Sequence, residues 1–247
     1  MTSGIIVATL ALVAYSLWVR RDTWWTRWEN AATLALALEA CALLLMSPWA
    51  GTKLGPALHH GLGVWNVQQL AGHLCLIVAV TANIYHMLVR LADPDQVRLI
   101  MRRQLMIPIW LGFAVMVPAY LRSDQDFQPD VFAAPRTDAW MMLYQLVGCV
   151  LMIYLSGYVS RLMLTLRRDP RAKPTIDLYL VSMTFATAAC LIVIGSTWVD
   201  GDDASPAIWL CICLAVATFA YGSAQSWKAK SAWFTSAGGG TPVVGAQ

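Results

Sequence analysis

Seven long apolar stretches, separated by short polar segments, run along the chain. Each is close to the ~20 residues that an α-helix needs to cross a ~30 Å hydrocarbon core, and the first is the shortest. They are Gly4–Val19, Ala31–Ala50, Gln69–Ala92, Gln104–Leu121, Ala139–Arg161, Leu178–Val199 and Ala207–Gln225. The pattern predicts an all-α bundle of seven transmembrane helices over residues 1–227. The small-residue end of the chain predicts a short, disordered tail over residues 228–247.

Composition supports a membrane protein. Of the 247 residues, 58% are hydrophobic and only 13% are charged, whereas a soluble domain carries about 25% charged residues. The formal net charge of +3 is too small to indicate nucleic acid as a partner. We therefore expect the lipid bilayer to be the main surroundings of the chain, as in a multi-pass protein of the plasma (inner) membrane.

Lys and Arg residues gather in alternate loops, and this bias predicts the orientation because positive residues favour the cytoplasmic side. Fourteen of them follow spans one, three, five and seven, and three occupy the other loops. The N-terminus should therefore lie outside and the C-terminus in the cytoplasm. The larger group is Arg20, Arg21, Arg27, Arg90, Arg98, Arg102, Arg103, Arg161, Arg167, Arg168, Arg171, Lys173, Lys228 and Lys230, and the smaller is Lys53, Arg122 and Arg136.

Glu39 is an acidic residue near the middle of the second span. A carboxylate at that depth is costly unless it is neutralised, paired or wetted, so ionisable residues inside spans often mark functional sites. We expect its side chain to face the bundle interior and to reach a polar group on the third span, with Asn83 at a similar depth. A proton or cation site and a purely structural carboxyl remain two interpretations of this residue.

The third span is the most polar of the seven. Asn83, His86 and Arg90 are spaced three and seven residues apart, so they share one helix face. That face is expected to open toward the cytoplasm, and His73 lies nearer the outer boundary. These positions predict a substrate or ion site that contains Glu39, Asn83, His86 and His73, although each histidine alone also suits a hydrogen bond between packed helices.

No residue pattern indicates a cofactor, a metal or a catalytic site. His73 and His86 are thirteen residues apart, as in some cytochromes that hold two haems, but the only other histidines, His59 and His60, lie together in one loop. No span contains the lysine that retinal requires. Because H-E-x-x-H and G-x-S-x-G are also missing, the sequence favours a protein without a cofactor and without enzymatic activity.

Residues 63–103 are similar to a family of uncharacterised actinobacterial multispanning membrane proteins described as transporters. The stretch GVWNVQQLAGHL at 63–74 opens a membrane helix that ends near Asp93-Pro94, with arginines following. The resemblance places Asn66, Gly72 and His73 on positions that recur in the family. It implies transport without naming a substrate, and it covers about 40 residues. Many members continue into a cytoplasmic region for which this chain has only a short tail, so no role of that region is carried over.

Two functions remain open at this point. The first is a transporter or channel-like protein for a small solute or ion, because the ionisable groups concentrate on spans two and three. The second is a membrane sensor or regulatory protein without transport activity, because the chain has no internal repeat and no second strong intramembrane charge. A homo-oligomer or a cytoplasmic protein partner is compatible with both. A water-filled path to Glu39 would favour the transporter.

Overall fold

The structure of the chain, a computed structural model, describes residues 2–26, 29–123, 126–130, 132–133, 138–197 and 204–238, the last six of these by their backbone only. Six of the described helices are long and apolar enough to cross a membrane, and a bent pair of helices makes up to seven spans. The chain is thus an all-helical, multi-pass membrane protein by helix length and hydropathy. Arg27, Arg136 and residues 239–247 of the expected tail lie outside the described residues.

The long helices follow the predicted spans closely. The bounds are α1 Thr2–Val19, α2 Asn30–Met46, α3 Pro48–Lys53, α4 Gly55–Leu62, α5 Val67–Leu91, α6 Pro94–Ile100, α7 Ile107–Arg122, α8 Ala139–Leu166, α9 Lys173–Gly195 and α10 Ser205–Gly238. A 3-10 turn, η1, covers Arg21–Trp25, and a π-helical turn, η2, covers Met101–Met106 between α6 and α7.

The second predicted span is broken. Helix α2 ends at Met46, and α3 and α4 leave it at an angle of 76°. Ser47 has an extended backbone because the ring of Pro48 disfavours the helical region for the residue before it. The Ser47 hydroxyl then accepts a hydrogen bond from the Ala50 amide at 3.2 Å and caps α3. The prediction of one continuous helix over Ala31–Ala50 is therefore wrong at its C-terminal end.

Two other helices are longer than the predicted spans. Helices α6 and α7 form one candidate span of 29 residues from Pro94 to Arg122, which starts well before the expected Gln104. Helix α10 continues to Gly238, past the expected domain boundary at Trp227. Lys228 and Lys230 therefore lie on a helix and contact the bundle, with Nζ of Lys228 donating to the Tyr15 hydroxyl at 2.6 Å.

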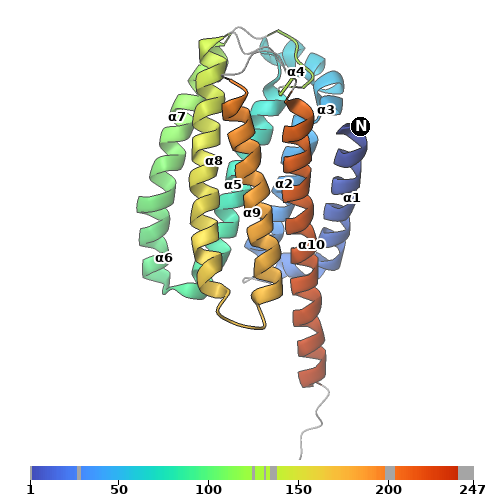
Figure 1. The fold of residues 1–247 in the computed structure, drawn as a ribbon, viewed down its shortest axis with the longest axis vertical. Helices are drawn as coiled ribbons and strands as arrows, with labels where there is room; N and C mark the ends of the chain where they lie inside the picture. Colours follow the sequence, from blue (N-terminus) through green and yellow to red (C-terminus); the bar gives the residue numbers. More distant parts are fainter. Residues whose placement is uncertain are drawn as a thin grey trace, which may run out of the picture.

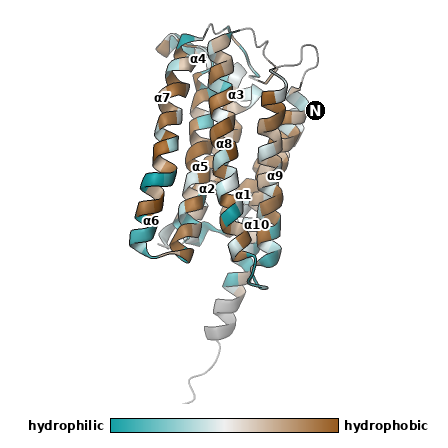
Figure 2. Ribbon diagram, turned by 60° about the vertical axis from the view of Figure 1, so that its left-hand side comes forward, coloured by the Kyte–Doolittle hydropathy of each residue, from teal (hydrophilic) through white to brown (hydrophobic). Residues whose placement is uncertain are grey.

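Six helices form a closed ring. In ring order α5, α2, α1, α10, α9 and α8 each contact the next, α8 returns to α5, and α7 packs outside against α8. Figure 2 shows hydrophobic residues along the middle of the helices and hydrophilic residues mainly near their ends. This arrangement encloses an interior that is lined mainly by side chains of the ring helices.

The two ends of the bundle differ. We call the end that holds η1, the α5–α6 junction, the α8–α9 connection and the last turns of α10 the Arg-rich end. We call the opposite end, where α3 and α4 lie across the bundle, the cap end (Figure 1). Asn66 has a left-handed backbone, with φ of 58°, and its side chain donates to the Asp126 carbonyl at 3.0 Å and accepts from the Gln128 amide at 3.2 Å. These bonds fasten the loop segment 126–130 over the cap end.

Gly51 is the point where α3 meets that loop segment. A Cβ atom added to Gly51 would overlap the backbone of Pro129, which cannot yield as a flexible side chain can. We expect Gly51→Ala to lower the free energy of unfolding by about 1–3 kcal/mol, the usual cost of overpacking. Gly61→Ala is the matched control, because a Cβ there meets nothing within 4 Å. Equal unfolding free energies for the two variants in detergent would contradict this packing.

Candidate functional site

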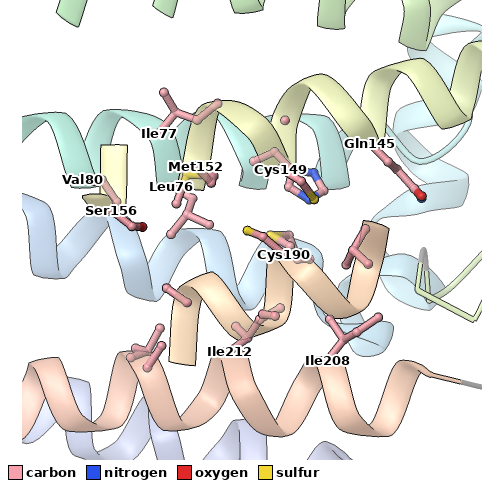
Figure 3. A pocket seen from close by; sticks show the side chains of 18 of the residues that line it. Leu76, Ile77, Val80, Gln145, Cys149, Met152, Ser156, Cys190, Ile208 and Ile212 are labelled. Atoms are coloured by element: carbon pink, nitrogen blue, oxygen red, sulfur yellow. The ribbon is translucent and has the colours of Figure 1, made fainter. Parts of the chain in front are cut away.

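A cavity of about 110 Å³ lies in the middle of the ring, between α2, α5, α8, α9 and α10. Most of the side chains around it are apolar, among them several Met, Ile and Ala residues and the sulfur-bearing Cys149 and Cys190 (Figure 3). The polar residues that line it are Glu39, His73, Tyr144, Gln145, Ser156 and Ser182. We call it the central cavity.

Glu39 faces the bundle interior, as expected. Its side chain lines the central cavity, the residue is only 6% exposed, and its Oε2 atom has no hydrogen-bond partner among the described residues. Helix α2 places it there because Leu36 and Leu43, one turn to either side, are buried on the same face. Asn83, the partner expected from the sequence, lines a different cavity, so the two side chains do not share one site.

His73 belongs to the central cavity, where it joins two helices. The Tyr144 hydroxyl and Nδ1 of His73 are 2.7 Å apart, and the two rings meet edge to face. This bond links α5 to α8, which is the packing role that the sequence left open for a lone histidine. His73 thus borders the central cavity beside Tyr144, while its polar ring atom Nδ1 is already engaged.

Phe132 closes the central cavity toward the cap end. Its ring lines the cavity and meets the rings of His73 and Trp209 edge to face. Asp130 holds this segment in place, since its carboxylate accepts from the Ser205 hydroxyl at 2.6 Å, from Trp209 Nε1 at 3.1 Å and from the Phe132 amide at 3.0 Å. The carboxylate of Asp130 therefore holds the loop segment that carries Phe132 to the start of α10.

A second, larger cavity of about 800 Å³ opens at the Arg-rich end. We call it the vestibule. Asn83, His86 and Arg90 line it together, which confirms that they share one face of α5. The four site residues expected from the sequence therefore divide between two cavities, with Glu39 and His73 in the central cavity and Asn83 and His86 in the vestibule.

Glu29 is the charged centre of the vestibule, and sequence reasoning missed it. Its carboxylate accepts from Arg20 at 2.9 Å, from Arg90 at 2.6 Å and from Lys230 at 2.7 Å, and His86 Nε2 is 4.0 Å away. Burial raises the pKa of Glu29, but the hydrogen bond and charge of Lys230 and the charges of Arg90 and His86 outweigh it and lower the pKa to about 2. The carboxylate thus stays ionised and ties α1, α5 and α10 together.

Arg20 is the most deeply buried of these cations, at 2% exposure. Besides Glu29, its guanidinium donates to the Thr33 hydroxyl at 3.2 Å and to the Ser223 carbonyl at 3.3 Å. The signal that sequence analysis passed over was an acid directly before the second span, at the end of the first basic loop. Only the fold reveals that the cations of three distant segments converge on it.

A single helical turn separates the two cavities on three helices. Along α5, Val80 lines the central cavity and Asn83 the vestibule; along α9 the corresponding pair is Ser182 and Tyr179, and along α10 it is Val216 and Phe219. Each pair is three residues apart, which is about 4.5 Å along a helix. The rings of Tyr179 and Phe219 pack with centroids 5.0 Å apart, and both line the vestibule where it approaches the central cavity.

The described part of the chain brings together no group of three or more His, Cys, Asp or Glu side chains that would suit a metal ion. The arrangement is instead that of two stacked cavities, one apolar with a buried acid and one polar with surplus positive charge. No protein-family model, no curated protein and no solved structure matches the chain.

Proposed function

We propose that the protein transports a small solute, that the central cavity holds the solute, and that the vestibule is its route to the Arg-rich side. The observation that carries the proposal is the single turn that divides the two cavities on α5, α9 and α10. A path toward Glu39 is therefore nearly complete from one side, which is the feature expected of a transporter that rests open to that side. The resemblance of residues 63–103 to a family described as transporters points the same way.

The barrier has the properties of a movable seal. Tyr179 and Phe219 meet through side chains alone, and rotamer changes of such residues need no refolding of a helix. On the cap side, the central cavity is covered by Phe132, which sits on a loop segment that Asp130 joins to α10. Each side of the cavity thus has its own closure, as alternating access requires.

Orientation is a second part of the proposal, because the Arg-rich end is assigned to the cytoplasm. A reporter fused after Gln247 should read as cytoplasmic, and a reporter inserted between Asp124 and Asp138 should read as external. The same reporter placed after Lys53 gives an independent check of the external side. A reporter that reads as external after Gln247 would contradict the assignment and exchange the two sides of the proposed route.

A membrane sensor is the second candidate. It is favoured by the link between Lys230 and Glu29, because α10 continues past the bundle at the Arg-rich end (Figure 1). A change in the vestibule would then be passed along α10 to a cytoplasmic partner. In that case, the central cavity need never open to both sides of the membrane.

Thiol labelling separates the two functions. Cys190 lines the central cavity, and none of the six cysteines, all of which are described, forms a disulfide, so a variant that keeps only Cys190 gives a specific probe. In oriented vesicles, a membrane-impermeant thiol reagent should modify Cys190 from either side if the protein transports. Labelling from one side only, or from neither, would contradict alternating access.

Removing the Phe219 ring, which lies between the two cavities, should speed the labelling of Cys190 from the Arg-rich side. Phe219→Ala is expected to raise the rate there by about tenfold or more, because a minor open state is typically populated at 0.1–10%. Tyr221→Ala is the matched control, since Tyr221 lies on the same helix but is exposed. Equal rates for the two variants would show that Phe219 does not close the path.

A further inference from the structure

Within the described part of the chain, two buried oxygen atoms of the central cavity have no hydrogen-bond partner. Oε2 of Glu39 and Oε1 of Gln145 are both buried and have no hydrogen-bond partner among the described residues. Both residues line the same cavity, and they are only 6% and 7% exposed. Buried polar atoms are normally hydrogen-bonded, and each exception asks for an explanation such as a missing ligand. In its ionised form Glu39 accepts hydrogen bonds, as the Gln145 oxygen does, so a molecule that donates would satisfy both oxygens.

The other polar groups around the cavity do not meet that demand. The hydroxyl of Ser182 donates to the Ala215 carbonyl at 2.7 Å, and Nδ1 of His73 pairs with the Tyr144 hydroxyl. No Lys or Arg lines the cavity. The cations of the vestibule are engaged by Glu29 beyond the barrier, so the described part of the chain supplies no positive charge to Glu39.

The size and lining of the cavity restrict what can enter. A volume of about 110 Å³ compares with the 150 Å³ apolar cavity that holds one benzene molecule. The lining is rich in Met, Ile and Ala, with sulfur atoms of Cys149 and Cys190 turned toward the space between α8 and α9 (Figure 3). Because this volume is smaller than that of the benzene site, the apolar body should be smaller than a six-membered ring, and it must carry a donor for the two acceptors.

We propose that the central cavity binds a small, largely apolar amine, with its ammonium group on Glu39 and with Gln145 as a second acceptor. This inference rests on the proposed function only where it calls the amine the transported solute. The amine can bind whether or not the protein transports it. Burying one unpaired ion costs several kcal/mol, so the cavity holds a net charge close to zero. Glu39 carries a proton when the cavity is empty, and the ammonium replaces that proton when the amine binds.

This exchange has a measurable consequence. Binding of the amine releases one proton from Glu39 to the solvent, whereas a neutral molecule of the same shape releases none. The other titratable groups around the cavity are His73, Tyr144, Cys149 and Cys190. Glu39 is the carboxylic acid among the residues that line it. Proton release therefore reports on Glu39 and not on simple filling of an apolar space.

Three small probes of nearly equal shape test the proposal: isobutylamine, isobutyl alcohol and 2-methylbutane. We would titrate each into the full chain in detergent micelles and subtract its partition into protein-free micelles. Isobutylamine should bind more tightly than 2-methylbutane by roughly tenfold to hundredfold, as a hydrogen bond to a charged group allows, with proton release detected in weak buffer. Equal affinities for all three probes would overturn the proposal and leave a merely apolar cavity.

Two variants locate the site. Glu39→Gln should lose both the preference for isobutylamine and the proton release, while it keeps its fold because a neutral carboxyl and an amide have the same shape. Gln145→Met should weaken the binding of isobutylamine and of isobutyl alcohol alike and keep the proton release. Proton release that persists in Glu39→Gln would overturn the assignment. If the amine binds but Cys190 is labelled from one side only or from neither side, transport is refuted and the amine site stands.

Discussion

Glu29→Gln is expected to lower the free energy of unfolding by about 3–5 kcal/mol, the usual result of removing one partner from a buried ion pair. The substitution leaves Arg20, at 2% exposure, charged and buried without a carboxylate. It also leaves Arg90 and Lys230, which now both bond to the same Glu29 oxygen, to repel one another. Denaturant unfolding in detergent measures the loss.

An exposed pair at the same end supplies the control for Glu29. Arg98 and Asp95 are 3.2 Å apart, but their side chains are 82% and 93% exposed. Asp95→Asn should therefore cost no more than about 0.5 kcal/mol. If Glu29→Gln proves no more destabilising than Asp95→Asn, the three-cation cluster does not hold the Arg-rich end together.

The Glu29 cluster also predicts a pH dependence. The pKa of Glu29 in the fold, about 2, lies below its ordinary value of 4.5, so the unfolded chain binds the proton more readily. The stabilisation by Glu29 is therefore complete above pH 4.5 and is lost as the pH falls toward 2. The difference in unfolding free energy between the parent protein and Glu29→Gln should shrink over that same interval. A constant difference would mean that Glu29 does not titrate there.

Asp130→Ala is expected to open the central cavity from the cap side. The change removes the acceptor of three donors, including Trp209 Nε1 on a residue that is only 1% exposed. A buried donor that is left without an acceptor costs about 1–3 kcal/mol. The segment that carries Phe132 should therefore detach from the start of α10. Impermeant thiol reagent added on the cap side should then modify Cys190 faster, and the unfolding free energy should fall by about 2–4 kcal/mol.

Asp138→Ala is the matched control for Asp130→Ala. Asp138 lies at the same end and caps α8 through bonds from the Trp140 and Met141 amides, both at 3.1 Å. Loss of a helix cap costs about 1 kcal/mol, yet Asp138 does not line the central cavity. Its removal should lower stability without changing the labelling of Cys190. Faster labelling in both variants would show that general loosening, and not the bond of Asp130, exposes the cavity.

The spans could be predicted from the sequence because the bilayer fixes the length of an apolar helix. The break after Met46 could not be predicted from hydropathy alone, since Ser47 and Pro48 interrupt the helix without interrupting the apolar run. The pair itself was a readable signal, because a residue before proline disfavours the helical conformation. Helix bounds in such a stretch depend on backbone sterics as much as on the solvent.

The candidate site was only partly predictable, for a geometric reason. The cost of a carboxyl against lipid predicted that Glu39 faces the bundle interior, and it does. Counting residues along a helix gives only the depth of Glu39. Which partner it faces depends on how α2 and α5 are rotated about their axes, and rotation placed Asn83 in the vestibule. The convergence of Arg20, Arg90 and Lys230 on Glu29 was beyond reach, because these cations come from segments up to about 200 residues apart and meet only through tertiary packing.

The unequal lengths of the helices have a consequence for the surrounding lipid. Helices α1 and α2 have 18 and 17 residues, while α8 has 28, so the lengths are about 26 Å on one side and about 42 Å on the other. These two sides of the bundle face away from each other (Figure 1). A bilayer of uniform thickness cannot match both lengths, so either the end of α8 projects into water, or the bundle tilts, or the lipid thins beside α1. If the lipid thins, short-chain lipids should gather along α1, and labelled lipids of different chain length would reveal that preference.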